Sequence, residues 1–107
     1  MAPPNLPLIH RGYPWWLRPF LRRDVAAITL GRHIWVSAAV RGEAMEALLR
    51  HERVHVAQQA RLGLLWFLLR YLGEYGANRL RGLGAEEAYR RISFEEEAFA
   101  AERGETV

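Results

Sequence analysis

Two histidines and a glutamate stand close together in the segment LLRHERVHVAQQ, residues 48–59. Their order is His51, Glu52, two other residues and then His55. On an α-helix, histidines four residues apart project toward one point, and a glutamate between them lies beside that point. The spacing is typical of a zinc site with a glutamate general base, because Zn²⁺ binds neutral imidazoles and keeps one position for water.

The phase of this helix indicates which of its faces is buried. At about 100° per residue, one arc holds a leucine and four polar residues: Leu48, His51, Glu52, His55 and Gln59. Arg50 and Arg53 fall on the opposite side. Imidazoles and a carboxylate on an inward face need partners, and a metal ion satisfies all of them at once. The alternative is a coincidental match, in which the two histidines are a satisfied structural pair.

A third protein ligand is required for zinc, and the C-terminal segment ISFEEEAFAAE supplies the candidates. They are four glutamates: Glu95, Glu96, Glu97 and Glu102. Residues three and four apart share a helix face, which places Glu95 on the apolar face of this segment. Glu97 is expected to face solvent, and Glu96 to complete a capping box with Ser93. A carboxylate on an apolar face needs a cation, so Glu95 is the predicted ligand.

Six elements are expected to position these residues. β-branched and aromatic residues on either side of a glycine predict strands at 28–30 and 34–37. Glycines and a candidate cap bound the predicted helices, which cover residues 43–61, 63–82, 85–91 and 93–103. The expected fold class is α+β, mostly α. A short N-terminal β-hairpin packs on the histidine-bearing helix, and a long second helix and a C-terminal helix with Glu95 follow.

The whole chain, residues 1–107, is expected to form one small domain, because a chain of this length supports a single core and little more. Residues 25–103 are the predicted core. Residues 1–22 hold all five prolines and are expected to form an extended arm, with Trp15 and Trp16 available to pack on the core or to cover the cleft.

Composition excludes several other classes of site. The chain has no cysteine, so it has no disulfide framework, cysteine zinc site or thiolate nucleophile. The net charge is +3, but the arginines alternate with glutamates along the chain, and no nucleic-acid partner is expected. The longest apolar run, residues 62–72, is short and contains Arg70, so no transmembrane segment is expected. The N-terminus does not have the pattern of a signal peptide, which predicts a cytoplasmic protein.

The motif HERVH followed by ISFEEEAFAAE resembles the gluzincin metallopeptidases, in which two histidines of one helix and a glutamate of a later helix bind zinc. SFEEEA is similar to the Ser-Phe-Glu-x-x-Ala-Asp segment of membrane-anchored CAAX-processing peptidases, and this register also selects Glu95. The strand pair and the His-Glu-x-x-His-x-x-Gln helix resemble small bacterial proteins, and the length is that of the minigluzincins. The resemblance covers residues 25–102 and implies a minimal zincin-like domain.

This resemblance implies a zinc metallopeptidase that acts on a peptide or protein. His51, His55 and Glu95 would hold Zn²⁺, and Glu52 would act as the general base toward water. The strand at 34–37 would lie along the edge of the cleft and pair with extended substrate.

Several further residues are expected to support the metal or the oxyanion. Tyr75, Tyr89 and Arg90 are the candidate oxyanion donors. Phe99 stands where the CAAX-type segment has an Asp that orients a zinc histidine. Gln59 and Glu102 are therefore the candidate outer partners of the site, with Glu102 able to take over the role of that Asp.

Two alternatives remain open at this point. One is a metal-binding domain without turnover, which Phe99 and the small size of the chain both permit. The other is a binding module for membranes or nucleic acid, which uses the basic and aromatic segment WWLRPFLRR, residues 15–23.

Overall fold

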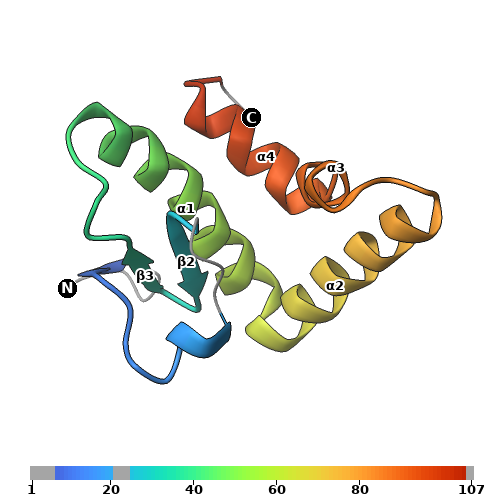
Figure 1. Cartoon of the computed structure of the whole chain (residues 1–107), viewed down its shortest axis with the longest axis horizontal. Coiled ribbons are helices and arrows are strands. Elements are labelled where there is room, and N and C mark those ends of the chain that lie inside the picture. The colour runs from blue at the N-terminus through green and yellow to red at the C-terminus, as the bar shows by residue number, and fades with distance from the viewer. Residues whose placement is uncertain (1–6, 21–24, 106–107) are drawn as a thin grey trace.

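The computed structural model describes residues 7–20 and 25–105 of the chain. Its elements, in order, are β1 (Leu8–Arg11), a 3-10 turn (Arg18–Phe20), β2 (Ala27–Leu30), β3 (His33–Val36), α1 (Glu43–Leu62), α2 (Leu64–Leu80), α3 (Ala85–Arg90) and α4 (Ser93–Glu102) (Figure 1). The predicted class, α+β and mostly α, is confirmed. No described helix is long and apolar enough to cross a membrane.

The sheet contains the predicted hairpin and one further strand. β2 and β3 pair antiparallel around a tight turn in which Gly31 takes a positive φ of 62°, a conformation that suits glycine. β1 pairs in parallel with the other side of β3, so the strand order is β1-β3-β2. The expectation of an arm outside the core was therefore wrong for Leu8–Arg11. A parallel partner far along the chain leaves no local sequence signal, which is why this strand was missed.

The expectation that residues 34–37 form the cleft edge was also wrong. β3 is the central strand, with neighbours on both sides, and β2 is one of the two edges. Ile34 and Val36 point from β3 toward α1 and are fully buried beside Val56. The alternation along β3 places Trp35 on the opposite face of the sheet.

The tryptophans of the N-terminal segment lie on that opposite face or in solvent. The ring of Trp16 packs edge-on against Trp35, with 5.9 Å between the ring centroids, and Trp15 is 82% exposed. His10 and His33 stack on Trp35 from the neighbouring strand and from the same strand. None of these side chains reaches the buried face of α1, so Trp15 and Trp16 do not cover the cleft. The part of WWLRPFLRR beyond residue 20 lies outside the described residues.

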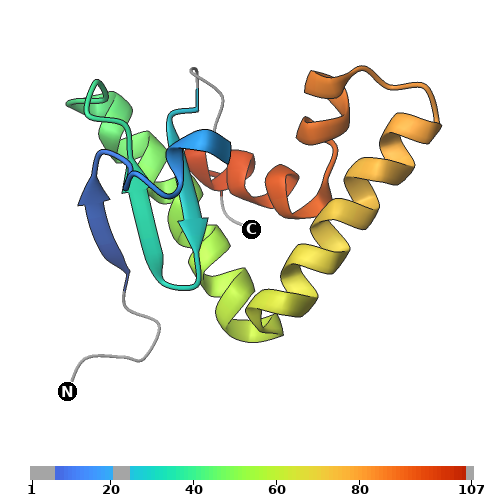
Figure 2. The same ribbon diagram turned by 60° about the horizontal axis from the view of Figure 1, so that its bottom comes forward.

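The helices follow the predicted boundaries within a few residues. Gly63, with φ of 85°, ends α1 and lets the chain turn directly into α2. The two helices diverge as a V, and α4 crosses α1 inside it (Figure 2). A second core of Phe67, Ile92 and Phe94 fills the space between α2 and α4.

The predicted capping box at the start of α4 was wrong. Ser93 is the first residue of the helix, and both its N–H and its hydroxyl donate to the carboxylate of Glu74 on α2, at 2.7 and 2.8 Å. A tertiary carboxylate thus replaces the local cap. Glu96 is exposed. The expectation that Glu97 faces solvent was wrong, because this residue packs toward α1, is half-buried and accepts a hydrogen bond from the amide of Gln58.

Candidate metal site

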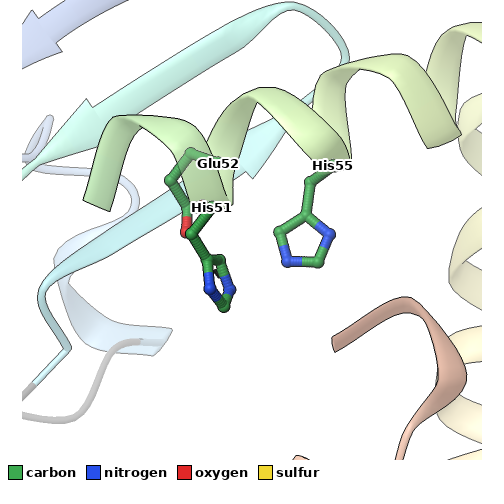
Figure 3. A group of neighbouring side chains, drawn as sticks. All are labelled: His51, Glu52 and His55. Atoms are coloured by element: carbon green, nitrogen blue, oxygen red, sulfur yellow. Dashed lines mark ion pairs between the residues drawn. The ribbon is translucent and has the colours of Figure 1, made fainter. Parts of the chain in front are cut away.

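The inward face of α1 carries the motif histidines, as its phase predicts. His51, Glu52 and His55 are each no more than 5% exposed. One ligand atom from each lies within 4.8 Å of the others, a spacing that suits a metal ion. Figure 3 shows both imidazoles projecting from the same side of α1, with the Glu52 carboxylate beside His51.

Glu95 reaches the same point from α4. Its Oε1 lies 2.8 Å from Nε2 of His51 and 3.0 Å from Nε2 of His55, and the residue is 4% exposed. Glu52 is less well placed as a third ligand, because its nearer oxygen is 3.7 Å from Nε2 of His51. Its other oxygen accepts a 2.8 Å hydrogen bond from the hydroxyl of Thr29 on β2. The contacts therefore favour Glu95 over Glu52 as the partner of the two imidazoles.

The hydrogen bond that His55 makes through Nδ1 fixes the state of its other ring nitrogen, Nε2, which faces Glu95. Nδ1 lies 2.8 Å from the side-chain oxygen of Gln58, whose amide nitrogen donates to the Phe94 carbonyl and to Glu97. With that oxygen as an acceptor, Nδ1 carries the hydrogen and donates. Nε2 of the neutral ring then points a lone pair at the carboxylate of Glu95. Either a proton or a metal cation between the two resolves this contact, so the donor set of two imidazoles and one carboxylate fits Zn²⁺.

The pKa shifts of the site also favour a positive charge between Glu95 and the two imidazoles. Burial alone would raise the pKa of Glu95, but hydrogen bonds with His51 and His55 and the charge of His55 lower this pKa to about 2. Burial would lower the pKa of His55, yet the hydrogen bond and charge of Glu95 outweigh it and raise that pKa. For Glu52, burial dominates and raises the pKa. The anionic Glu95 thus attracts positive charge to the imidazoles, while burial disfavours the charged form of Glu52.

Two side chains that were not predicted from the sequence, Tyr71 and Gln58, hold the outer atoms of Glu95 and His55. The hydroxyl of Tyr71 on α2 donates to Oε2 of Glu95 at 2.6 Å, and Gln58 orients His55. Gln58 falls in the same helical arc as His51 and is 1% exposed, so phase was the signal that could have found it. Tyr71 and Thr29 lie on other elements, and nothing in their local sequence marks them.

The predicted outer residues divide into two groups. Oε1 of Glu102 lies 3.1 Å from Nδ1 of His51, within ion-pair range. The angle between these atoms does not satisfy a hydrogen bond, and Nδ1 of His51 has no hydrogen-bond partner among the described residues. Phe99 packs edge-on against His51, with 4.6 Å between the ring centroids. The hydroxyl of Tyr89 lies 3.4 Å from Oε1 of Glu95. Tyr89 and Glu102 therefore reach the site itself.

Gln59, Tyr75 and Arg90 do not touch the ligands. Gln59 accepts from the N–H of Gly31 and donates to the Thr29 carbonyl, so it fastens the β2–β3 turn to α1 and makes no hydrogen bond to His51, His55 or Glu95 among the described residues. Tyr75 packs on the second core. Arg90 pairs with Glu86 and lies over the ring of Phe99. All three line the adjoining cavity.

That cavity has a volume of about 730 Å³ and opens beside the histidines. One wall is β2 with the residues just before it, 25–30, and the opposite wall consists of aromatic side chains from α2, α3 and α4. Because β2 is an edge strand, this wall presents main-chain donors and acceptors as well as side chains.

Comparison with known proteins finds similarity over part of the chain. Residues 21–63 match the family described as the eCIS core domain. The matched segment holds β2, β3 and α1, with His51, Glu52 and His55, and it ends before α4. No curated protein and no solved structure matches the chain. The likeness to gluzincins stays a prediction from the motifs.

Proposed function

We propose that this protein is a zinc-dependent hydrolase of the metallopeptidase type, with a gluzincin-like ligand set. His51, His55 and Glu95 are the proposed ligands, and Glu52 is the proposed general base. The observation that carries the proposal is the position of Glu95 Oε1 against both Nε2 nitrogens, with the Glu52 carboxylate 3.7 Å from His51 and not hydrogen-bonded to it.

A bound Zn²⁺ would supply a Lewis acid that polarises a carbonyl and makes water more acidic. The residues around it have separate tasks. Tyr71 and Gln58 hold Glu95 and His55 so that their donor atoms converge. Thr29 occupies one oxygen of Glu52 and leaves the other to accept a proton from water and return it to a leaving amine. Burial raises the pKa of the Glu52 carboxyl, which is the direction expected for a carboxylate that accepts a proton from water.

Substrate binding is proposed along β2 in place of the strand at 34–37. An extended peptide that adds to the free edge of β2 would run past Glu52, because Thr29 of that strand donates to it. Tyr89 and Arg90 line the cavity on its other side and are the proposed donors to the carbonyl oxygen as charge develops there.

The test is Glu52→Gln in protein purified without a histidine tag. We expect hydrolysis of a fluorogenic peptide library to fall by about 10²- to 10⁴-fold, as for loss of a general base. Bound zinc, measured by elemental analysis, should stay at the wild-type level. Glu46→Gln, an exposed site on the same helix, is the matched control and should change neither quantity.

Three outcomes would contradict the proposal or part of it. Wild-type protein that takes up no zinc on reconstitution would end it. Equal hydrolysis by Glu52→Gln and wild type would remove Glu52 as the base. Zinc binding that depends on Glu95, without hydrolysis of any library member, would establish the inert metal-binding domain instead.

The similarity to the eCIS core domain supports a second statement about biological context. We propose that the chain is a component of an extracellular contractile injection system, since the matched residues include the whole histidine-bearing helix. Co-sedimentation with injection particles assembled in the host that encodes the chain tests this. Particles without the chain, together with free chain in the supernatant, would contradict it.

A further inference from the structure

The outward face of α2 is apolar and lies in solvent. Five large side chains form it, and each is 53–91% exposed: Leu65, Trp66, Leu69, Leu72 and Leu80. At about 100° per residue they fall in one arc of the helix together with Gly73 and Gly76. The opposite arc, which includes Phe67 and Asn78, packs into the protein. In both ribbon views no described element lies on the outer flank of α2 (Figures 1 and 2).

Arginines border this face, and no acidic side chain does. Arg79 lies on one side of the arc and Arg70 on the other, and Arg61 lies in the last turn of α1, just before the Gly63 turn into α2. Glu74 is the single acidic residue of α2, and its carboxylate accepts from Ser93 and pairs with Arg70, so the charge of Arg70 is already matched. Among the described residues, no ion pair includes Arg61 or Arg79.

We propose that this face of α2, defined by Leu65, Trp66, Leu69, Leu72 and Leu80, docks on an anionic lipid surface. An apolar arc flanked by cations is the arrangement of helices that lie flat in the interface of a bilayer, with the arginines near lipid phosphates. Trp66 sits at the start of the arc, and tryptophan favours the interfacial region. The charge pattern selects this occupant over a second copy, because Arg61 and Arg79 have no acidic partner among the described residues and two such faces would bring like charges together.

This inference does not depend on the proposed hydrolase. Co-sedimentation with vesicles of phosphatidylcholine, with and without phosphatidylglycerol, is the direct test. We expect binding to the anionic vesicles that weakens as salt is raised, and much weaker binding to neutral ones. The double variant Arg61→Gln/Arg79→Gln should lose about fivefold for each arginine on anionic vesicles, from about 1 kcal/mol per basic residue.

The triple variant Leu65→Gln/Leu69→Gln/Leu72→Gln should reduce binding to both kinds of vesicle. Its sites are exposed, and circular dichroism checks that it folds; if it does not fold, the arginine variant decides the question. Trp15→Gln is the matched control, because it removes an exposed tryptophan from a different surface and should bind as wild type does.

The inference is overturned if wild type does not bind anionic vesicles, or if both α2 variants bind as well as wild type. It is also overturned if Trp15→Gln alone removes binding, since the N-terminal segment would then be the anchor. Concentration-dependent dimers that the leucine variant abolishes, without vesicle binding, would assign the face to a second copy of the chain.

Discussion

Removal of one hydroxyl from Tyr71 should weaken zinc binding without disturbing the fold. Tyr71 donates the 2.6 Å hydrogen bond to Oε2 of Glu95, the oxygen that faces away from the histidines. Burial and the nearby charge of Glu95 raise the pKa of Tyr71, so the phenol remains a protonated donor across the accessible pH range. Tyr71→Phe keeps the ring and its packing against Phe67 while it removes that donor.

The expected magnitude follows from the partners that remain. A hydrogen bond to a charged group contributes about 1.5–3 kcal/mol, which is about 10- to 150-fold in a binding constant. Tyr89 lies 3.4 Å from the other carboxylate oxygen of Glu95 and does not replace the lost bond. Loss of an outer partner of a metal ligand typically costs about 10- to 100-fold in affinity. We therefore expect the zinc dissociation constant of Tyr71→Phe to rise by about 10- to 100-fold.

Competition with a chromophoric chelator measures this constant, and α2 provides a matched control. Tyr75 lies one turn further along, lines the same cavity and makes no hydrogen bond among the described residues to Glu95. Tyr75→Phe should bind zinc within about twofold of wild type, because no partner of a proposed ligand is lost. Equal zinc affinity for wild type and Tyr71→Phe would refute the assignment of Glu95 as a ligand held by Tyr71. An equal loss in both variants would show that the effect comes from packing on α2.

Three other predictions follow from the contacts around the site. Zinc at a hundredfold above its dissociation constant should stabilise the protein by about 2.7 kcal/mol and raise its melting temperature in differential scanning fluorimetry. EDTA should reverse this rise, and the same rise in His51→Ala would contradict the assignment of His51 as a ligand. Gln59→Ala should cost about 1–3 kcal/mol in chemical unfolding, because the N–H of Gly31 and the carbonyl of Thr29 lose their partner, and it should leave zinc affinity unchanged. Burial would raise the pKa of Glu74, but the donors of Ser93 and Arg70 lower it, so the carboxylate stabilises the fold above its unfolded pKa and loses this effect as pH falls. Glu74→Gln should thus cost about 1 kcal/mol at pH 7 and progressively less below about pH 4, whereas a loss that is constant with pH would contradict a role for the charge.

Helical periodicity was sufficient to predict the half of the site on α1. An amphipathic helix buries one arc, and the positions of His51, Glu52 and His55 in that arc follow from their spacing alone. The same reasoning on the C-terminal segment selected Glu95 among four glutamates, and this residue is the one that contacts both imidazoles. Periodicity works here because burial of a charged side chain is costly and is tolerated only where partners are present.

Contacts between elements that are distant along the chain were not predictable in the same way. The cap of α4 comes from Glu74, the holder of Glu95 comes from Tyr71, and β1 joins β3 in parallel. Each depends on how two elements cross, and no local pattern encodes a crossing. Where sequence offered a local solution, such as the capping box of Ser93 with Glu96, a tertiary carboxylate displaced it.

The division of the site between two parts of the chain limits what the matched family segment can explain. Residues 21–63 contain both histidines and Glu52, but they end thirty-odd residues before the proposed third ligand. Both imidazoles project from the same face of α1, yet their inner nitrogens meet the Glu95 carboxylate only because α4 packs across α1. Gln58 binds the Phe94 carbonyl, and Arg50 binds the carbonyls of Ala101 and Glu102, so α1 holds both ends of α4. The packing of α4 on α1 is thus the structural step that turns a helical motif into a three-donor site.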